Sequence, residues 1–231
     1  MNAALNTDAS REASPESDAK LVALARAQLY AGLSRLLASP EQAIARAWLD
    51  HVSIIERLLI ADEALASEGS RIAELFALSQ AADLEHSAED VAARVGASYG
   101  ALFEVGDRGP PLAIREELAP NANAAAKEEV ARFYEHFGYR LGDEYAWRPD
   151  HLSVLLEFMH FLSWHESQSL DAALVAGLRA AQRDFCQRHL ASWVGELADS
   201  VAARSDAHPL LQASLQATKD FIVVELQSLG D

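Results

Sequence analysis

Apolar residues recur at helical spacing along most of this 231-residue chain, with short polar or proline-containing breaks between the runs. Between Ala19 and Leu37, for example, leucines and alanines return every three or four residues, which places them on one face of a helix. Half of the residues are hydrophobic, which is enough to bury a sizeable core. The pattern predicts an all-α protein, a single-domain bundle of about eight to ten helices.

The predicted helices follow one another closely. We expect them at 19–37, from Ser39 to about Ala61, at 71–82, from Ser87 onward, at 124–137, from Pro149 to Glu166, and at 168–188, 189–204 and 208–229. Ser87-Ala-Glu-Asp90 resembles a capping box, and Gly138 is expected to end the helix before it. Residues 1–18 are polar and are expected to form a disordered tail, so that the helical domain spans 19–231.

The longest break in the helical pattern runs from Gly106 to Asn123. Its main part, GDRGPPLAIREELAPN, holds two glycines and three prolines, which interrupt helices. Structureless segments of this length are uncommon in compact domains, and they are often functional. The segment is therefore a candidate binding loop.

Charge and cysteine content narrow the function classes. The formal net charge is -16, which disfavours nucleic acids and anionic membranes as partners and would attract a basic peptide, although solubility alone explains such a surface. Cys186 is the single cysteine, so neither an intrachain disulfide nor a cysteine metal site is possible, and we expect it to be packed in the core. The chain has no apolar run of membrane-spanning length and no signal-peptide pattern at its N-terminus, which predicts a cytoplasmic protein without stable membrane insertion.

The stretch RPDHLSVLLEFMHFLSWHE, from Arg148 to Glu166, combines a core-like helix with polar residues at its start. With Pro149 in the first turn, Asp150 is expected to cap the helix, to bind a ligand, or both. A helical projection places Asp150, Glu157 and His160 on a narrow polar strip. His151 projects toward the apolar side, where a core role is commoner than a ligand role.

Glu157 and His160 form an E-x-x-H pair, which suggests a second hypothesis. Di-iron bundles use two such pairs together with two further glutamates. Asp83-Leu-Glu-His86 is only a weaker partner, and no other inward glutamate is apparent. A helical di-iron carboxylate protein using Glu157 and His160 is therefore the alternative interpretation, and a helical adaptor without peptide specificity is the third.

Four motifs follow one another in a specific order. They are Tyr99-Gly-Ala-Leu102-Phe103, a loop with Pro110-Pro111, Val130-Ala-Arg-Phe133-Tyr134 followed by Gly138, and Pro149-Asp150-His151-Leu152 with Glu157-Phe158-Met159. Their order and spacing resemble the TorD/DmsD family of redox-enzyme maturation chaperones, which is related more distantly to the NarJ type. The resemblance covers roughly residues 95–166, and the flanking helices fit in character.

The resemblance implies a cytoplasmic, all-helical chaperone without catalytic activity or cofactor. Its partner would be the catalytic subunit of a molybdopterin-containing oxidoreductase, held by its twin-arginine leader until the molybdenum cofactor is inserted. The peptide-binding positions carried over from the family are Tyr99, Leu102, Phe103, Pro110, Pro111, Asp150 and His151. Leu102-Phe-Glu-Val-Gly106 resembles relatives that serve enzymes of the dimethyl sulfide, ethylbenzene or selenate type.

The chemistry of the candidate residues is compatible with binding of a twin-arginine leader. Planar guanidinium groups suit carboxylates, so Asp150 and Glu157 are candidate acceptors for the leader arginines. The apolar part of a leader needs an apolar groove, which Leu102, Phe103, Pro111 and Leu112 are candidates to supply. Both a monomer and a domain-swapped dimer remain open, because leucine-rich bundles can exchange elements between protomers.

Overall fold

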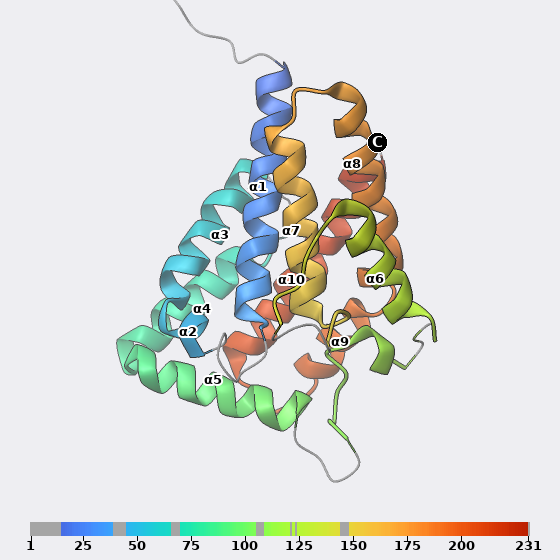
Figure 1. Ribbon diagram of the computed structural model, residues 1–231. Helices are drawn as coiled ribbons and strands as arrows, with labels where there is room; N and C mark the ends of the chain where they lie inside the picture. The colour runs from blue at the N-terminus through green and yellow to red at the C-terminus, as the bar shows by residue number, and fades with distance from the viewer. Residues whose placement is uncertain are drawn as a thin grey trace, which may run out of the picture.

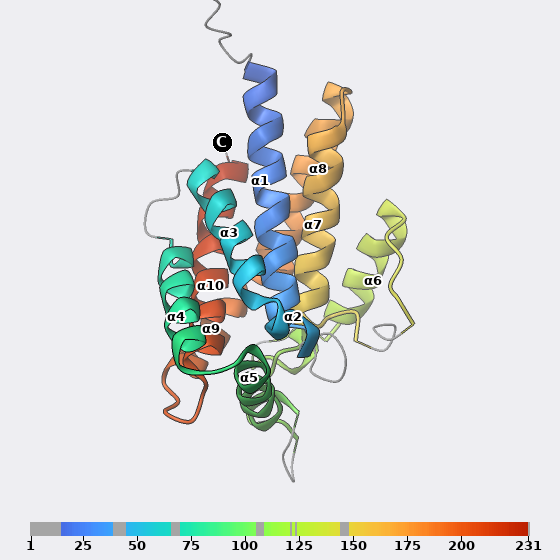
Figure 2. The same ribbon diagram turned by 90° about the vertical axis from the view of Figure 1, so that its left-hand side faces the viewer.

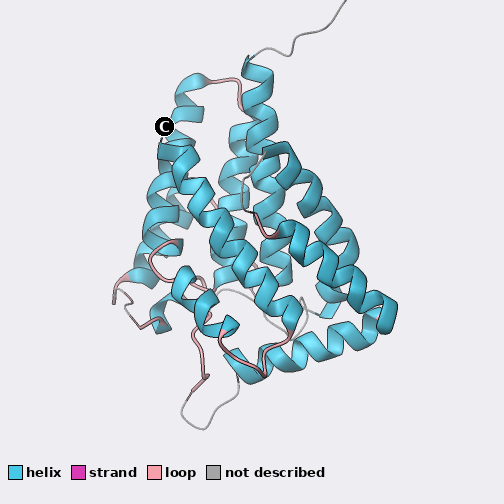
Figure 3. Ribbon diagram, turned by 180° about the vertical axis from the view of Figure 1, so that it is seen from behind, coloured by secondary structure: helices cyan, strands magenta, loops and turns pink. Residues whose placement is uncertain are grey.

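The computed structural model describes residues 15–38, 45–65, 70–104, 109–120, 122, 124–143 and 148–230. Its helices are α1 (Pro15–Leu36), α2 (Ala45–Leu49), α3 (His51–Leu65), α4 (Ile72–Glu85), α5 (Ala88–Phe103), the 3₁₀ helix η2 (Glu116–Leu118), α6 (Ala126–Phe137), α7 (Leu152–Gln168), α8 (Ala172–Phe185), the π-helix η3 (Cys186–Leu190), α9 (Val194–Ala202) and α10 (Pro209–Gly230). Seen from behind, the described part of the chain consists of helices and loops (Figure 3). The predicted all-α bundle is confirmed.

Helices α1 and α7 pack side by side at the centre of the molecule, and they share the most extensive contact between any two elements (Figure 1). Helix α3 covers α1, and α8 packs beside α7. Helix α5 crosses the lower end of the bundle in both side views, next to α2 (Figure 2). None of the described helices is long and apolar enough to cross a membrane.

One continuous apolar core joins the helices. Leu29, Leu33, Leu155 and Phe158 are among its fully buried members, from the central helices α1 and α7. Gly32 lets α1 lie close against α3, because a Cβ atom there would lie 2.5 Å from the Leu58 side chain. Interiors this tightly packed do not tolerate such an overlap without movement of the neighbour.

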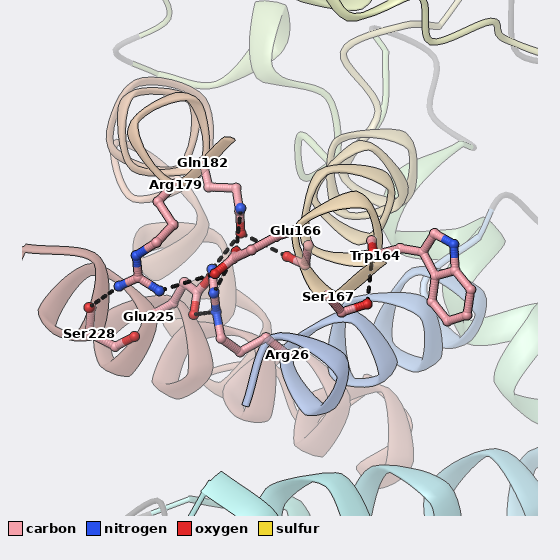
Figure 4. Close-up of polar contacts among 9 residues, drawn as sticks. Arg26, Trp164, Glu166, Ser167, Arg179, Gln182, Glu225 and Ser228 are labelled. Atoms are coloured by element: carbon pink, nitrogen blue, oxygen red, sulfur yellow. Dashed lines mark hydrogen bonds and ion pairs between the residues drawn. The ribbon is translucent and has the colours of Figure 1, made fainter. Parts of the chain in front are cut away.

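A buried ionic cluster joins several helices across the same core (Figure 4). Arg26 on α1 donates to Glu225 on α10 through Nε at 2.8 Å, and it donates to Glu166 on α7 at 3.0 Å. Gln182 on α8 joins the cluster by donating to Glu166 at 2.8 Å. Burial alone lowers the pKa of Arg26, but Glu225 and Glu166 outweigh it and raise that pKa above its ordinary value. The cluster therefore ties four helices together.

Several predicted helix boundaries are wrong, among them two in the N-terminal part of the chain. Helix α1 begins at Pro15 rather than after residue 18, because a proline suits the first helical position and Glu16 and Asp18 favour the positive helix end. The helix expected from Ser39 to Ala61 is divided into α2 and α3 at Asp50, and its predicted start lies outside the described residues. Nδ1 of His51 bonds the carbonyl of Trp48 at 2.6 Å across this division.

Candidate functional site

The N-terminal end of α7 differs from its predicted form. Pro149 and Asp150 lie in a turn before the helix, and the N-cap is His151. Nδ1 of His151 accepts the backbone N–H of Ser153 at 3.2 Å and contacts the Ser153 hydroxyl at 2.8 Å. The expectation that Asp150 caps the helix is therefore wrong: the His151 ring accepts a free N–H of the first turn, and the Asp150 carboxylate accepts the N–H of Glu117 instead.

Residues 109–120, which we call the proline loop, are fastened to this end of α7 by backbone hydrogen bonds. Glu116 N–H donates to Asp150 O and Leu152 N–H donates to Ile114 O, each at 3.0 Å. These bonds flank an isolated antiparallel bridge between Arg115 and His151. A third bond, from Leu112 N–H to Leu102 O at 3.0 Å, holds the loop against the end of α5.

The Asp150 side chain binds the proline loop by a hydrogen bond to its backbone. It is fully buried, and its Oδ2 accepts the backbone N–H of Glu117 at 3.0 Å. Its Oδ1 lies 3.4 Å from the Arg115 guanidinium, which also contacts Glu117. The carboxylate predicted to receive a leader arginine thus already faces an arginine of its own chain.

Tyr99 and His151 meet beneath the loop. The Tyr99 hydroxyl lies 2.9 Å from Nε2 of His151, and both side chains are buried. Because Nδ1 accepts a backbone N–H, we assign the ring proton to Nε2, which donates to Tyr99. Burial, followed by the positive charges of Arg148 and Arg115, lowers the pKa of His151 to about 3. The ring is therefore neutral at physiological pH.

A second buried pair anchors the far side of the loop. Nδ1 of His189, in the π-helix η3, lies 3.1 Å from both carboxylate oxygens of Glu116. The His189 carbonyl in turn accepts the indole N–H of Trp193 at 2.7 Å. Glu116 thereby links the proline loop to the segment that leads into α9.

An open groove of about 380 Å³, which we call the proline groove, lies between the proline loop and α9. Its lining residues are Gly109, Pro110, Pro111, Leu112, Ala113, Leu118, Ala119 and Pro120 from the loop, and Trp193, Glu196, Leu197 and Ser200 from the α9 segment. Both segments lie at the lower end of the bundle (Figure 1). The groove is mostly apolar and has one charged lining residue, Glu196.

The predicted site residues separate into two layers. Pro110 and Pro111 are exposed and Leu112 is half-buried, and all three line the proline groove. The buried residues lie behind the loop and support it: they are Tyr99, Leu102, Phe103, Asp150 and His151. Glu157 is exposed on α7 and does not line the groove.

Sequence reasoning missed the α9 wall of the groove. Trp193, Glu196, Leu197 and Ser200 follow the i, i+3, i+4, i+7 spacing of one helix face. That spacing was visible in the sequence, but any amphipathic helix has it. The contact between Glu116 and His189, which are 73 positions apart, helps to hold this face against the proline loop.

Other grooves also occur among the described residues. One of about 670 Å³ lies between α1 and α3 and includes the exposed side chains Leu21 and Ile60. Another, about 490 Å³, lies between α1 and the α7–α8 junction. Neither is lined by a residue predicted for peptide binding, so we place the candidate site at the smaller proline groove.

The di-iron alternative has no site in the described part of the chain. No group of three or more histidine, cysteine, aspartate or glutamate side chains there is arranged to hold a metal ion. Nδ1 of His160 bonds the carbonyl of Ala27 at 2.9 Å instead. Cys186, as predicted, is buried in the core, and burial raises the pKa of its thiol to about 12.

Residues 63–199, more than half of the chain, match the protein family described as nitrate reductase delta subunit. The chain belongs to this family. The part that matches the nitrate reductase delta subunit family includes the proline loop, α7 and most of α9. The relationship predicted from the four motifs is thereby confirmed.

Several proteins named as chaperones are similar to the chain. A selenate reductase assembly chaperone protein from Thauera selenatis is 30% identical over 58% of this chain and 74% of its own length. A dimethyl sulfide dehydrogenase assembly chaperone protein from Rhodovulum sulfidophilum is 36% identical over 54% of this chain and 53% of its own length. The chaperone protein TorD from Vibrio cholerae is 25% identical over 89% of this chain and 92% of its own length. No solved structure gives a significant match.

Proposed function

We propose that this protein is an assembly chaperone for the catalytic subunit of a molybdopterin-containing oxidoreductase. It binds the twin-arginine leader of the unfilled subunit in the cytoplasm and delays export until the molybdenum cofactor is inserted. In this role it carries out no catalysis. One observation carries the proposal: the loop with Pro110-Pro111 forms a wall of an open groove in a chain whose relatives are named assembly chaperones of redox enzymes.

The motif residues have two different roles, contact with the leader and support of the loop. Pro110, Pro111 and Leu112 contact the apolar part of the leader, because they line the groove. Asp150 and His151 are buried and support the loop, Asp150 through its side chain and His151 through its backbone bridge to Arg115. We assign no leader contact to Glu157, which lies outside the groove.

A peptide titration tests this proposal. The probe is a synthetic leader, with two adjacent arginines and an apolar run, from the redox-enzyme subunit encoded nearest this gene. The expected result is saturable binding at micromolar peptide concentration, measured by calorimetry at low salt. A matched peptide with both arginines replaced by glutamine is expected to bind more weakly, because guanidinium groups lose their attraction to the acidic protein.

The same assay with the intact subunit separates the chaperone from a general adaptor. A leader-specific chaperone binds the apo-subunit more tightly when the leader is present. Equal affinity for the full subunit and for the leader-deleted subunit would instead identify an adaptor without leader specificity. Absence of any binding to peptide or subunit would contradict the proposed function.

A further inference from the structure

We infer that α9 forms the second wall of the leader site and that Glu196 accepts an arginine of the client leader there. This inference rests on the proposed function and assigns the recognition chemistry of its site. The occupant is a short segment in which an arginine lies beside an apolar run. The groove volume of about 380 Å³ suits such a segment rather than a whole leader.

The α9 wall is held firmly in place. Trp193 is buried, and its indole N–H donates to the His189 carbonyl at 2.7 Å. Leu197 is buried one turn farther on, and Ala198 and Val201 pack into the core behind it. A side chain fixed on such a helix face is positioned more precisely than one on a free loop.

The loop wall favours recognition by side chains over strand pairing. Pro110, Pro111 and Pro120 have no backbone N–H to offer a peptide. The N–H groups of Leu112, Leu118 and Ala119 already donate to Leu102, Arg115 and Glu116. The loop therefore has few free backbone N–H groups with which a bound segment could pair as an added strand. The apolar side chains of the segment instead contact the prolines and leucines of the groove.

Glu196 is the one charged residue that lines this apolar groove. It is exposed in the first turn of α9, and it forms no ion pair with any residue of the described part of the chain. The carboxylate is thus available to a cation that enters the groove, and because it is exposed the attraction is modest. A guanidinium matches it in shape and charge. Asp150 is unsuited to this contact, because it is fully buried against Arg115 and Glu117.

The test is a double-mutant cycle between the protein and the leader probe. Glu196→Gln is expected to weaken binding of the twin-arginine peptide by up to about fivefold, the upper end of the range for an exposed charge pair. The same substitution is expected to change binding of the arginine-to-glutamine peptide much less, because that peptide lacks the guanidinium groups that would pair with Glu196. Measuring both affinities with both proteins gives the coupling between Glu196 and the leader arginines.

Two further variants complete the design. Glu63→Gln, an exposed carboxylate on α3 outside the proline groove, removes the same charge and is expected to leave affinity nearly unchanged. Ser200→Phe is expected to fill the groove and block the peptide without disturbing the core, since Ser200 is only half-buried. Wild-type binding with zero coupling at Glu196 would overturn the inference, whereas no wild-type binding would overturn the proposed function itself.

Discussion

At the scale of single residues, the His151 ring couples α5 to the start of α7. The neutral ring accepts the Ser153 N–H with Nδ1 and faces the Tyr99 hydroxyl with Nε2. A proton on Nδ1 would remove the acceptor that caps the helix. The ring can serve both contacts only while it is neutral, which agrees with its lowered pKa.

This arrangement predicts a pH-dependent stability. The pKa of His151 in the folded protein is about 3, below the ordinary value of 6.5. Its contribution to the free energy of unfolding is therefore complete above pH 6.5, and it is lost as the pH falls toward 3, because the unfolded chain binds the proton first. Within that window the contribution declines by up to about 1.4 kcal/mol per pH unit. His151→Asn keeps a capping side chain without a titrating ring. Denaturant unfolding across this range is expected to show a shallower pH slope for the variant, and identical slopes would exclude His151 as the cause.

Arg26 has a structural rather than a binding role. Arg26→Met leaves Glu225 buried without its cation, so we expect the free energy of unfolding to fall by about 3–5 kcal/mol. Arg35→Met removes an exposed arginine from the same helix and is expected to change stability by less than about 0.5 kcal/mol. Chemical denaturation measures both, and equal losses for the two variants would contradict this role.

At the scale of elements, helices whose signals lie within one segment were predictable. Ser87 accepts the N–H of Asp90 at the start of α5, and Gly138 ends α6 in a left-handed conformation with φ of 70°, as the sequence indicated. The role of Asp150 was not predictable, because its partner Glu117 N–H lies 33 residues away. Local patterns carry no information about such long-range contacts, and the α9 wall was missed for the same reason.

The Asp150 contact predicts how the proline loop responds to mutation. Asp150→Ala removes the acceptor of the Glu117 N–H, so amide hydrogen exchange at Glu117 is expected to accelerate while α7 stays protected. The affinity of the Asp150→Ala variant for the leader is also expected to fall, because the loop wall is no longer held in one position. Unchanged exchange at Glu117 in a folded variant would show that the side chain does not restrain the loop.

At the scale of the whole molecule, the net charge of -16 resides mostly on the outside, because few charged side chains are buried in the described part of the chain. Of the buried carboxylates, Glu166 and Glu225 pair with Arg26, and Glu166 also pairs with the half-buried Arg179. The field of the negative surface speeds the approach of a basic peptide but does not choose where it binds. Grooves of different size compete for the peptide, and the groove between α1 and α3 is larger than the proline groove.

Photo-crosslinking tests the location of the leader directly. The probe is the twin-arginine peptide with a photoreactive phenylalanine analogue in its apolar run, irradiated with the folded protein and mapped by mass spectrometry. The account predicts crosslinks within the proline loop, residues 109–120, and within residues 193–200 of the α9 wall. Crosslinks concentrated on Leu21, Val22 or Ile60, in the groove between α1 and α3, would contradict it.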